Sequence, residues 1–573
     1  MVLPCLIKRN FSVKNYRILK DSGIHPLLSR IWAARGISNV NDTILELSNL
    51  ASTINLTNAR LAARILNNAI ENHRKILIVA DYDCDGATAC AVAFRALSDM
   101  GADVNFFVPN RFETGYGLSI AVVEKLIQKK NYKPDLIITV DNGITSVEGV
   151  DAANSLGIGV IITDHHLPGD TMPEALAIVN PNQKECKFPS KNLSGVGVIF
   201  YLMLELRSEM RRCGKYAVHG GPKLSNLLDL VALGTMADVV KLDFNNRLLV
   251  YQGLKRIRNG KLKPGLEALF TIAKRNPNDA ICSDLSFLIA PRINAAGRLK
   301  DMTLGINCLL TDDFQEAMNI AKELNSINKQ RQMIELNMKE QAINTANEII
   351  NQSSEKNTLC IHDHRWHQGV IGLIASKLKD RFWKPTIIFA SIDNGKIRGS
   401  GRSIPDVNLR DILDTISKRH IGLINNFGGH ALAAGLTLNK SDHSNFASIF
   451  ENVVEEILKQ KKVLPIVETD GSLEIEYMNV EIASLLKQHI WGSGFNDPLF
   501  LDYFFVQNQK LISGKHLKLL LKRENAHFEA ICFNRVEIVP NHVKAAYRLE
   551  KFDWKGKSKI YLKIEYIESI EKS

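Results

Sequence analysis

Short β-branched runs alternate with helical patterns through the first half of the sequence, and this alternation constrains the fold more than any other feature. Candidate strands lie at 76–80, 105–108, 136–140, 160–163 and 177–179, with candidate helices near 87–99, 118–129 and 145–156. Strands that alternate with helices build a parallel sheet covered on both faces. Ligands bind such sheets at the carboxyl ends of the strands. The sequence therefore predicts a doubly wound α/β domain with its site just after the strands.

The remainder of the chain predicts further domains, since 573 residues exceed what one core holds. Residues 313–352 contain neither glycine nor proline and carry a helical pattern. A helix of that length would span roughly 60 Å, which suits a bridge between lobes. Segments at 358–361, 367–382, 385–390 and 396–399 predict a smaller α/β domain, interrupted by Gly399, Gly401, Gly428 and Gly429. Beyond about 466, period-two runs such as 559–566 predict a small β-barrel.

Composition narrows the class of protein. The formal charge of +11 suits a polyanionic partner, although many basic proteins bind no nucleic acid. The nine cysteines form no CxxC pair, so neither a disulfide framework nor a structural zinc site is indicated. Charges interrupt the start of the chain, and no apolar run reaches the roughly 18 residues of a membrane span. We expect a cytoplasmic protein that does not enter a membrane.

The first strand runs directly into the segment DYDCDG, which carries Asp81, Asp83 and Asp85. Three carboxylates this close repel one another unless a cation neutralises them. Taken alone, the segment fits a solvated acidic turn or a helix N-cap somewhat better than a metal site.

Other ligand-type side chains follow other apolar elements, and a parallel sheet would bring the strand ends to one rim. The third strand ends in Asp141-Asn142-Gly143, the fourth in Asp164-His165-His166, and an apolar helix at 227–233 runs into Gly234-Thr235-Met236-Ala237-Asp238. Carboxylates with few imidazoles and no thiolate favour Mn²⁺ or Mg²⁺. Cys84 lies within the first motif, and we interpret it as a packing residue that points away from the metals. The ligands suffice for two ions, and paired ions are typical of phosphodiester hydrolysis.

These segments resemble a known family. DYDCDG, DNG, DHH and GTMAD are similar, in order, to the four motifs of the DHH phosphoesterases. VPNRFETGYGLS (108–119), RINAAGR (292–298), WHQGVIGLIASKL (366–378), GSGRS (399–403) and GGHALAAG (428–435) resemble the RecJ exonucleases within that family. The resemblance implies a 5′→3′ exonuclease for single-stranded DNA, acting in DNA recombination and repair. It also implies a parallel-sheet DHH catalytic domain, a long helix, a smaller α/β DHH-associated domain and an OB-like barrel.

The expected domain boundaries are a helical extension at 1–70, the catalytic domain at 71–312, the connecting helix at 313–352, the DHH-associated domain at 353–465 and the barrel at 466–573. The resemblance implies two divalent cations held by Asp81, Asp83, Asp85, Asp141, His165 and Asp238. His166 is then a ligand or a transition-state donor, and Asp164 orients its neighbours. Which aspartate of the first motif binds which ion stays open.

Substrate contacts follow from the same resemblance. Arg111, Arg292 and Arg298 would face the phosphate backbone, with surface charge or internal ion pairing as the alternative. Ser400 and Arg402 offer donors that suit a terminal 5′ phosphate. His430 is either a phosphate donor or an interface histidine.

The barrel segment interleaves basic and aromatic residues, which is typical of single-strand binding. The basic residues include Lys515, Lys518 and Lys522, with His516 and Arg523. The aromatic residues are Tyr503, Phe504, Phe505 and Phe528, and for any one of them a place inside the barrel is the better interpretation.

Two alternatives stay open. A small-substrate DHH phosphoesterase would generally lack the long helix and the barrel, whereas an inactive DNA-binding relative would have lost metal ligands. The RecJ resemblance further implies a monomer, with single-strand-binding protein and helicases as partners.

Overall fold

The structure is a computed structural model that describes residues 4–110, 112–128, 133–216, 220–352, 356–392, 394–459, 463–554 and 557–570. The chain forms two compact units. One contains Lys8–Asn325 and Glu468–Ser573, and the other contains Ser326–Val467 with the N-terminal segment that ends at Ile7.

The larger unit contains a parallel sheet of five strands in the order β3-β2-β4-β5-β6. The strands are β2 (Lys75–Ala80), β3 (Asp103–Phe107), β4 (Leu136–Val140), β5 (Gly159–Thr163) and β6 (Ala177–Val179). From β2 the chain adds β3 on one side and β4 on the other, so the strand order reverses between β2 and β4. The predicted doubly wound sheet is confirmed, and ligands of such sheets bind where the order reverses.

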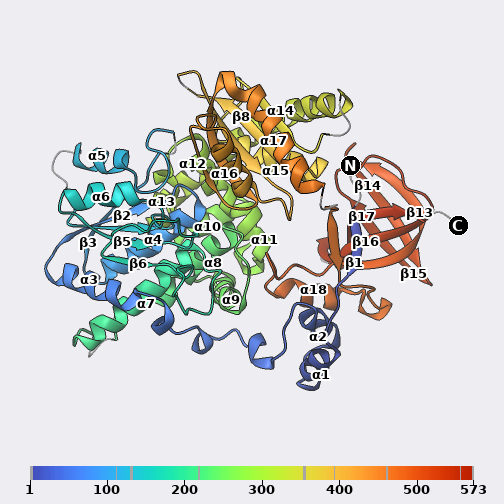
Figure 1. Cartoon of the computed structure of the whole chain (residues 1–573). Helices are drawn as coiled ribbons and strands as arrows, with labels where there is room; N and C mark the ends of the chain where they lie inside the picture. The colour runs from blue at the N-terminus through green and yellow to red at the C-terminus, as the bar shows by residue number, and fades with distance from the viewer. Residues whose placement is uncertain are drawn as a thin grey trace. The chain divides into compact units, whose positions relative to one another are not determined.

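Side chains of the central strands alternate between two apolar clusters. Ile76 and Ile78 point into the large core, whereas Leu77 and Val79 pack in a second cluster with Val122. Figure 1 shows α5 and α6 on one side of this sheet and α3 and α7 on the other. The helices that flank the sheet are α3 (Ala59–Glu71), α4 (Cys84–Asp99), α5 (Ile120–Gln128), α6 (Val147–Ser155) and α7 (Gly195–Arg212).

A helical layer completes this part of the unit. It includes α8 (Leu228–Ala237), whose residues are buried from Leu228 to Met236. Asp238 therefore lies directly at the end of a buried helix. The other helices of the larger unit before the barrel are α1 (Val13–Asp21), α2 (Pro26–Ala33), α9 (Phe244–Arg258), α10 (Pro264–Ile272), α11 (Cys282–Asp284), α12 (Ala290–Leu299) and α13 (Thr303–Leu310), of which α1 and α2 lie near α18 in Figure 1.

The C-terminal part of the same unit is a closed barrel in the order β13-β14-β15-β17-β16. Alternate residues of β13, from Phe500 to Val506, are buried in its interior, as the period-two pattern predicted. The elements are α18 (Val480–Gln488), β13 (Phe500–Ile512), β14 (His516–Arg523), β15 (Ala526–Cys532), β16 (His542–Trp554) and β17 (Lys557–Ser569). The predicted barrel is confirmed.

The smaller unit contains a five-stranded sheet in the order β10-β11-β9-β8-β7. It begins within α14 (Phe314–Gln352), the long helix expected from the run without glycine or proline. The other elements are β7 (Leu359–Asp363), α15 (Ile371–Phe382), β8 (Thr386–Ser391), β9 (Lys396–Arg402), α16 (Leu409–Arg419), β10 (Asn426–Gly429), β11 (Ala433–Asn439) and α17 (His443–Leu458). A short two-stranded sheet joins β1 (Cys5–Lys8) to β12 (Ile466–Thr469).

The expectation that glycines interrupt this domain is wrong, because Gly399 and Gly401 lie inside β9, and Gly428 and Gly429 form the end of β10. A Cβ atom on Gly399 would lie 2.5 Å from the Phe389 ring, and one on Gly401 would lie 2.5 Å from Leu409. Glycine is therefore present here because neighbouring side chains pack directly against the strand.

Among the described residues, no helix combines the length and the apolar character that crossing a bilayer would need.

Candidate active site

Seven ligand-type side chains gather at the carboxyl ends of the strands. Asp81 follows β2, Asp141 follows β4 and His165 follows β5, while Asp83 caps α4 and Asp238 caps α8. Their ligand atoms form three groups, each within 4.8 Å: Asp81, Asp83 and Asp141; Asp141, His165 and His166; and Asp85, His165 and Asp238. The structure thus brings together all six predicted metal ligands, and Asp141 and His165 each belong to two groups.

Two atoms at the centre of this cluster are not satisfied by a protein hydrogen bond. Asp141 Oδ1 and His165 Nε2 are buried, and neither has a hydrogen-bond partner among the described residues. They lie 3.1 Å apart, and His165 Nε2 lies 3.5 Å from Asp238 Oδ2. Buried polar atoms are normally satisfied, so these atoms fit a cation bound between them. Carboxylates and imidazoles without a thiolate suit Mn²⁺ or Mg²⁺.

The electrostatics of the cluster also favour bound cations. Burial, with repulsion from Asp238 next, raises the pKa of Asp85 to about 8. Burial and the Asp83 charge raise the pKa of Asp238 to about 8. Burial and the charge of Asp85 raise the pKa of Asp141 well above its ordinary value. Because a cation stabilises the ionised form of each carboxyl, it would offset this repulsion.

Asp164 belongs to none of the three ligand groups and instead binds its own neighbours. Its carboxylate accepts hydrogen bonds from the backbone amides of Ile144 (2.9 Å), His165 (2.7 Å) and His166 (3.1 Å). It also lies 2.7 Å from His166 Nδ1. Burial lowers the pKa of His166, but the Asp164 hydrogen bond and charge outweigh that effect and raise it to about 9. This geometry fits the orienting role expected for Asp164.

Backbone geometry holds the carboxylates in place. Asp141 has a φ of 62°, which is a left-handed conformation that aspartate and asparagine tolerate better than most residues. Asp85 accepts hydrogen bonds from the amides of Gly195 (2.6 Å) and Val196 (3.0 Å) at the start of α7. A Cβ atom on Gly195 would lie 2.4 Å from Asp141 Oδ1. Gly195 was not predicted from the sequence, because its only signal is a serine N-cap before a helical pattern.

Two further residues at the site were also missed. The Tyr116 hydroxyl lies 3.4 Å from His166 Nδ1 and 3.5 Å from the carbonyl oxygen of Asp141. Asn294 Oδ1 accepts a hydrogen bond from the Cys84 amide at 2.8 Å, which ties α12 to the first motif. Both lie in segments that the resemblance had already marked, and Cys84 is buried in the apolar core as expected.

Three arginines were predicted to contact the phosphate backbone of DNA, and the structure describes two of them. Arg111 lies outside the described residues. Arg292 Nε donates to Asn325 Oδ1 at 3.1 Å, and its Nη1 donates to the Leu288 carbonyl, so this guanidinium bonds within the protein. Arg298 lies half-buried in the last turn of α12, the helix that packs on the first motif.

The smaller unit brings Ser400 and Arg402 together on β9. Arg402 Nη1 donates to the Gly401 carbonyl at 2.7 Å and to Ser400 Oγ at 3.3 Å. A Cβ atom on Gly372 would lie 2.9 Å from Ser400 Oγ, so the first turn of α15 approaches both side chains. His430 lies in the turn between β10 and β11, where Ala433 pairs with Arg402.

Comparison with known proteins identifies the family to which this chain belongs. Models of the DHH family N-terminal domain, the DHHA1 domain and the RecJ OB domain match residues 75–235, 355–460 and 469–566. The single-stranded-DNA-specific exonuclease RecJ of Haemophilus influenzae is 41% identical over 559 residues, which cover 96% of this chain and 97% of that protein. The chain belongs to the RecJ family.

Solved RecJ structures share the fold. A crystal structure of RecJ from Thermus thermophilus in complex with Mn²⁺ aligns with a TM-score of 0.80 at 26% identity, covering 99% of this chain and 79% of that one. A second structure of the same enzyme contains Mg²⁺ and aligns with a TM-score of 0.77 at 25% identity, covering 99% and 78%. Both ions are those that the donor set of this chain favours.

The RecJ OB domain separates the predicted aromatic residues into two sets. Phe504 and Phe528 are 3% and 7% exposed and fill the barrel, whereas Tyr503 and Phe505 are 64% and 39% exposed. Phe505 pairs across the strands with Lys522, and its ring contacts His542.

The basic residues of the barrel also differ. Lys515 is exposed in the turn between β13 and β14. Lys518 is 3.0 Å from Glu529, and Arg523 is 3.0 Å from Asp502. Arg523 also donates to the Leu473 carbonyl at 2.7 Å, so it serves the barrel's own structure.

Proposed function

We propose that the chain is a metal-dependent exonuclease that degrades single-stranded DNA in the 5′→3′ direction, in DNA recombination and repair. The observation that carries this proposal is the gathering of five carboxylates and two imidazoles at the strand ends, in a chain whose relatives are single-stranded-DNA-specific exonucleases. We propose Asp81, Asp83, Asp85, Asp141, His165 and Asp238 as the metal ligands.

The residues of the site would have distinct roles in phosphodiester hydrolysis. Two Mn²⁺ or Mg²⁺ ions held by these ligands would activate water and neutralise charge on the scissile phosphate. Asp141 belongs to two ligand groups and its carboxylate has two oxygens, so it could serve both ion positions, whereas His165 would donate one nitrogen to a single ion. His166 has a raised pKa and its Nδ1 is held by Asp164, so Nε2 is the candidate donor to a phosphate oxygen.

We assign recognition of the 5′ end to the smaller unit. Ser400, Arg402 and the first turn of α15 offer hydroxyl, guanidinium and backbone donors within one small region. These are the donors that bind a terminal phosphate. His430 is the further candidate, whereas Arg111 and Arg298 remain proposed contacts of the phosphate backbone.

The barrel would hold the single strand farther from its end. Tyr503 and Phe505 are the aromatic side chains placed to stack on bases, and Lys515 and Lys522 are the accompanying cations. Lys518 would contribute less, because Glu529 neutralises it.

The division into a helical extension (1–70), a catalytic domain (71–312), a connecting helix (313–352), a DHH-associated domain (353–465) and a barrel (466–573) is part of the proposal. So are a monomeric state, a cytoplasmic location, and single-strand-binding protein and helicases as partners.

The test is a degradation time course with Mn²⁺ on single strands labelled at the 5′ or the 3′ end. A 5′→3′ exonuclease releases the 5′ label first as a short product and shortens the 3′-labelled strand progressively. Duplex DNA and short oligoribonucleotides serve as comparison substrates. Preference for the oligoribonucleotides would favour a small-substrate phosphoesterase, and release of the 3′ label first would overturn the polarity.

A further inference from the structure

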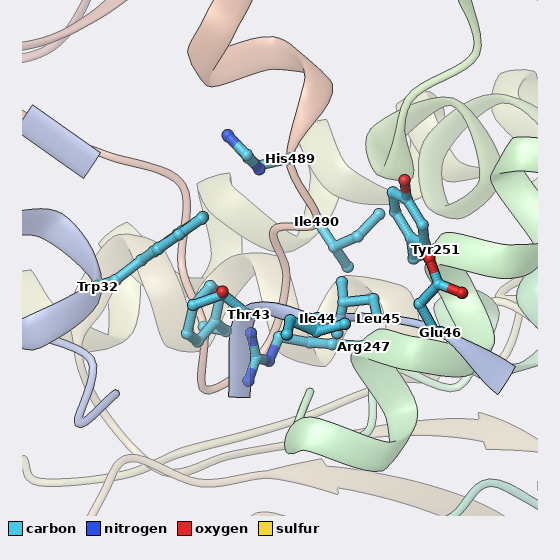
Figure 2. Close-up of a pocket in the computed structure, with 10 residues that line it drawn as sticks. Trp32, Thr43, Ile44, Leu45, Glu46, Arg247, Tyr251, His489 and Ile490 are labelled. Carbon is cyan, nitrogen blue, oxygen red and sulfur yellow. The ribbon is translucent and has the colours of Figure 1, made fainter. Parts of the chain in front are cut away.

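A pocket of about 270 Å³ lies in the larger unit, and it shares no residue with the metal cluster. Its walls come from α2 and the segment after it, from α9 and from the segment after α18. In Figure 2, His489 and Arg247 lie on opposite sides of this pocket, and Trp32 and Tyr251 lie on the other two. The pocket is small, near the lower end of the roughly 300–1,000 Å³ range of small-molecule sites.

Arg247 is the buried charged group of this pocket and is only 5% exposed. Its guanidinium stacks on the Phe495 ring at 4.4 Å, and one Nη donates to the Asp42 carbonyl at 3.3 Å. Its Nε has no hydrogen-bond partner, and no carboxylate of the described residues lies within ion-pair distance. Burial lowers the pKa of Arg247 to about 10, so it stays charged at neutral pH. The charges of Asp42 and Asp243 offset only part of the cost of burying this cation, because neither carboxylate pairs with it directly, so a bound anion would stabilise Arg247.

His489 provides a second unsatisfied group. Its Nε2 atom is buried without a hydrogen-bond partner among the described residues, and its ring meets the Trp32 ring edge-on at 5.0 Å. Burial, with the nearby Arg258 charge, lowers its pKa to about 4, so the imidazole is neutral and can either donate or accept. A ligand that satisfies both groups needs an anionic end and a planar end with hydrogen-bonding atoms.

We propose that this pocket binds a nucleoside monophosphate, with the phosphate on Arg247 and the base among Trp32, Tyr251 and His489. An arginine fork matches phosphate oxygens, and aromatic rings stack on any base. Glu46 also lines the pocket, but it is exposed to solvent and forms no ion pair with the buried Arg247. That the occupant in the cell is a deoxynucleotide rests on the proposed function, because an exonuclease releases nucleotides.

The test is a titration of dAMP into the full-length chain carrying Asp141→Asn, with Mg²⁺ present, followed by tryptophan fluorescence. Hydrolysis is not needed for this readout, so failure of the exonuclease proposal would leave it unaffected. We expect saturable quenching with a Kd below about 1 mM, lost in Trp32→Phe. Arg247→Met should weaken dAMP binding at least about tenfold. Lys255→Met, which removes an exposed charge from the same helix, should leave it unchanged.

His489→Leu keeps the proposal testable if Arg247→Met does not fold, and it should weaken dAMP binding while leaving binding of inorganic phosphate unchanged. Deoxyadenosine and phosphate alone should each bind more weakly than dAMP. The proposal is overturned if no saturable quenching occurs, or if Arg247→Met and His489→Leu both bind dAMP as well as the Lys255→Met control does. Tighter binding of a short acidic peptide than of dAMP would also overturn it.

Discussion

The backbone amide of Gly195 donates a hydrogen bond to Asp85 Oδ2 at 2.6 Å, at a point where a side chain on residue 195 would strike Asp141. One residue thus supports two proposed metal ligands, from the first turn of a helix that contributes no ligand of its own. Positive charge at a helix N-terminus also stabilises the Asp85 carboxylate.

Gly195→Ala should therefore lower Mn²⁺-dependent hydrolysis roughly a hundredfold, because a displacement of about 1 Å in a catalytic group has that effect. The variant should still fold, since the helix itself accepts alanine. Gly169→Ala is the matched control, because its added Cβ would meet nothing closer than 3.7 Å. Equal rates for the two variants would show that the close approach to Asp141 is unimportant.

The raised carboxyl pKa values predict a pH-dependent response to metal. Asp85 and Asp238 have pKa values of about 8 in the folded chain, above the ordinary value of 3.8. The folded metal-free chain therefore holds more protons than the unfolded chain between about pH 4 and pH 8, so this contribution to stability falls as the pH rises through that window. Protons also compete with metal at the lower pH.

The increase in Tm on adding Mn²⁺ should accordingly be larger at pH 8 than at pH 6, as measured by thermal unfolding. The Asp238→Asn variant should show a smaller difference between the two pH values. An increase in Tm that is independent of pH in the unaltered chain would contradict the account in which metal binding displaces protons from these two carboxyls.

Arg402→Ala should impair strands with a 5′ phosphate more than strands with a 5′ hydroxyl. The loss of a charge-assisted pair costs about 1.5–3 kcal/mol, which corresponds to a roughly ten- to hundredfold fall in kcat/KM for the phosphorylated strand. Lys396→Ala, an exposed lysine on the same strand, should change neither value. An equal fall for both substrates would make Arg402 a general or structural contact.

Substitutions at two adjacent residues of β13 should have different effects, one on the affinity for DNA and the other on the stability of the fold. Tyr503→Ala should weaken binding of long single strands by about 1–3 kcal/mol, the usual effect of losing one stacking ring, and leave the Tm nearly unchanged. Phe504→Ala should cost about 3–5 kcal/mol of stability, because it leaves a cavity inside the barrel. Fluorescence anisotropy and thermal unfolding measure the two effects, and an undiminished affinity in Tyr503→Ala would remove this strand from the binding surface.

Much of the fold could be predicted from the sequence because it rests on local patterns. Strands without charged residues, such as 136–140, and barrel strands with period-two alternation can be recognised from short runs of sequence. The proximity of Asp81, Asp141 and His165 could also be predicted, because the carboxyl ends of parallel strands meet at one edge of a sheet. The long helix was predicted from the absence of helix-breaking residues over 313–352.

Other features depend on contacts between distant residues and could not be predicted. Gly399 and Gly401 were interpreted as interruptions, yet packing of Phe389 and Leu409 places them inside a strand. Whether Arg292 faces DNA or the protein depends on Asn325, which lies on another helix. The buried Arg247 pocket has no signal in the sequence, because its walls come from three separate segments.

The most direct test of the proposed metal site is the single-turnover rate of Asp141→Asn on single-stranded DNA with saturating Mn²⁺. Asparagine tolerates the left-handed φ of 62° at this position, so the variant should fold, and removing a buried carboxylate among others should keep or raise the Tm of the metal-free chain. We predict a rate below a few per cent of that of the unaltered chain, since Asp141 belongs to two of the ligand groups. A folded Asp141→Asn variant that kept a substantial fraction of the rate would contradict hydrolysis at this cluster.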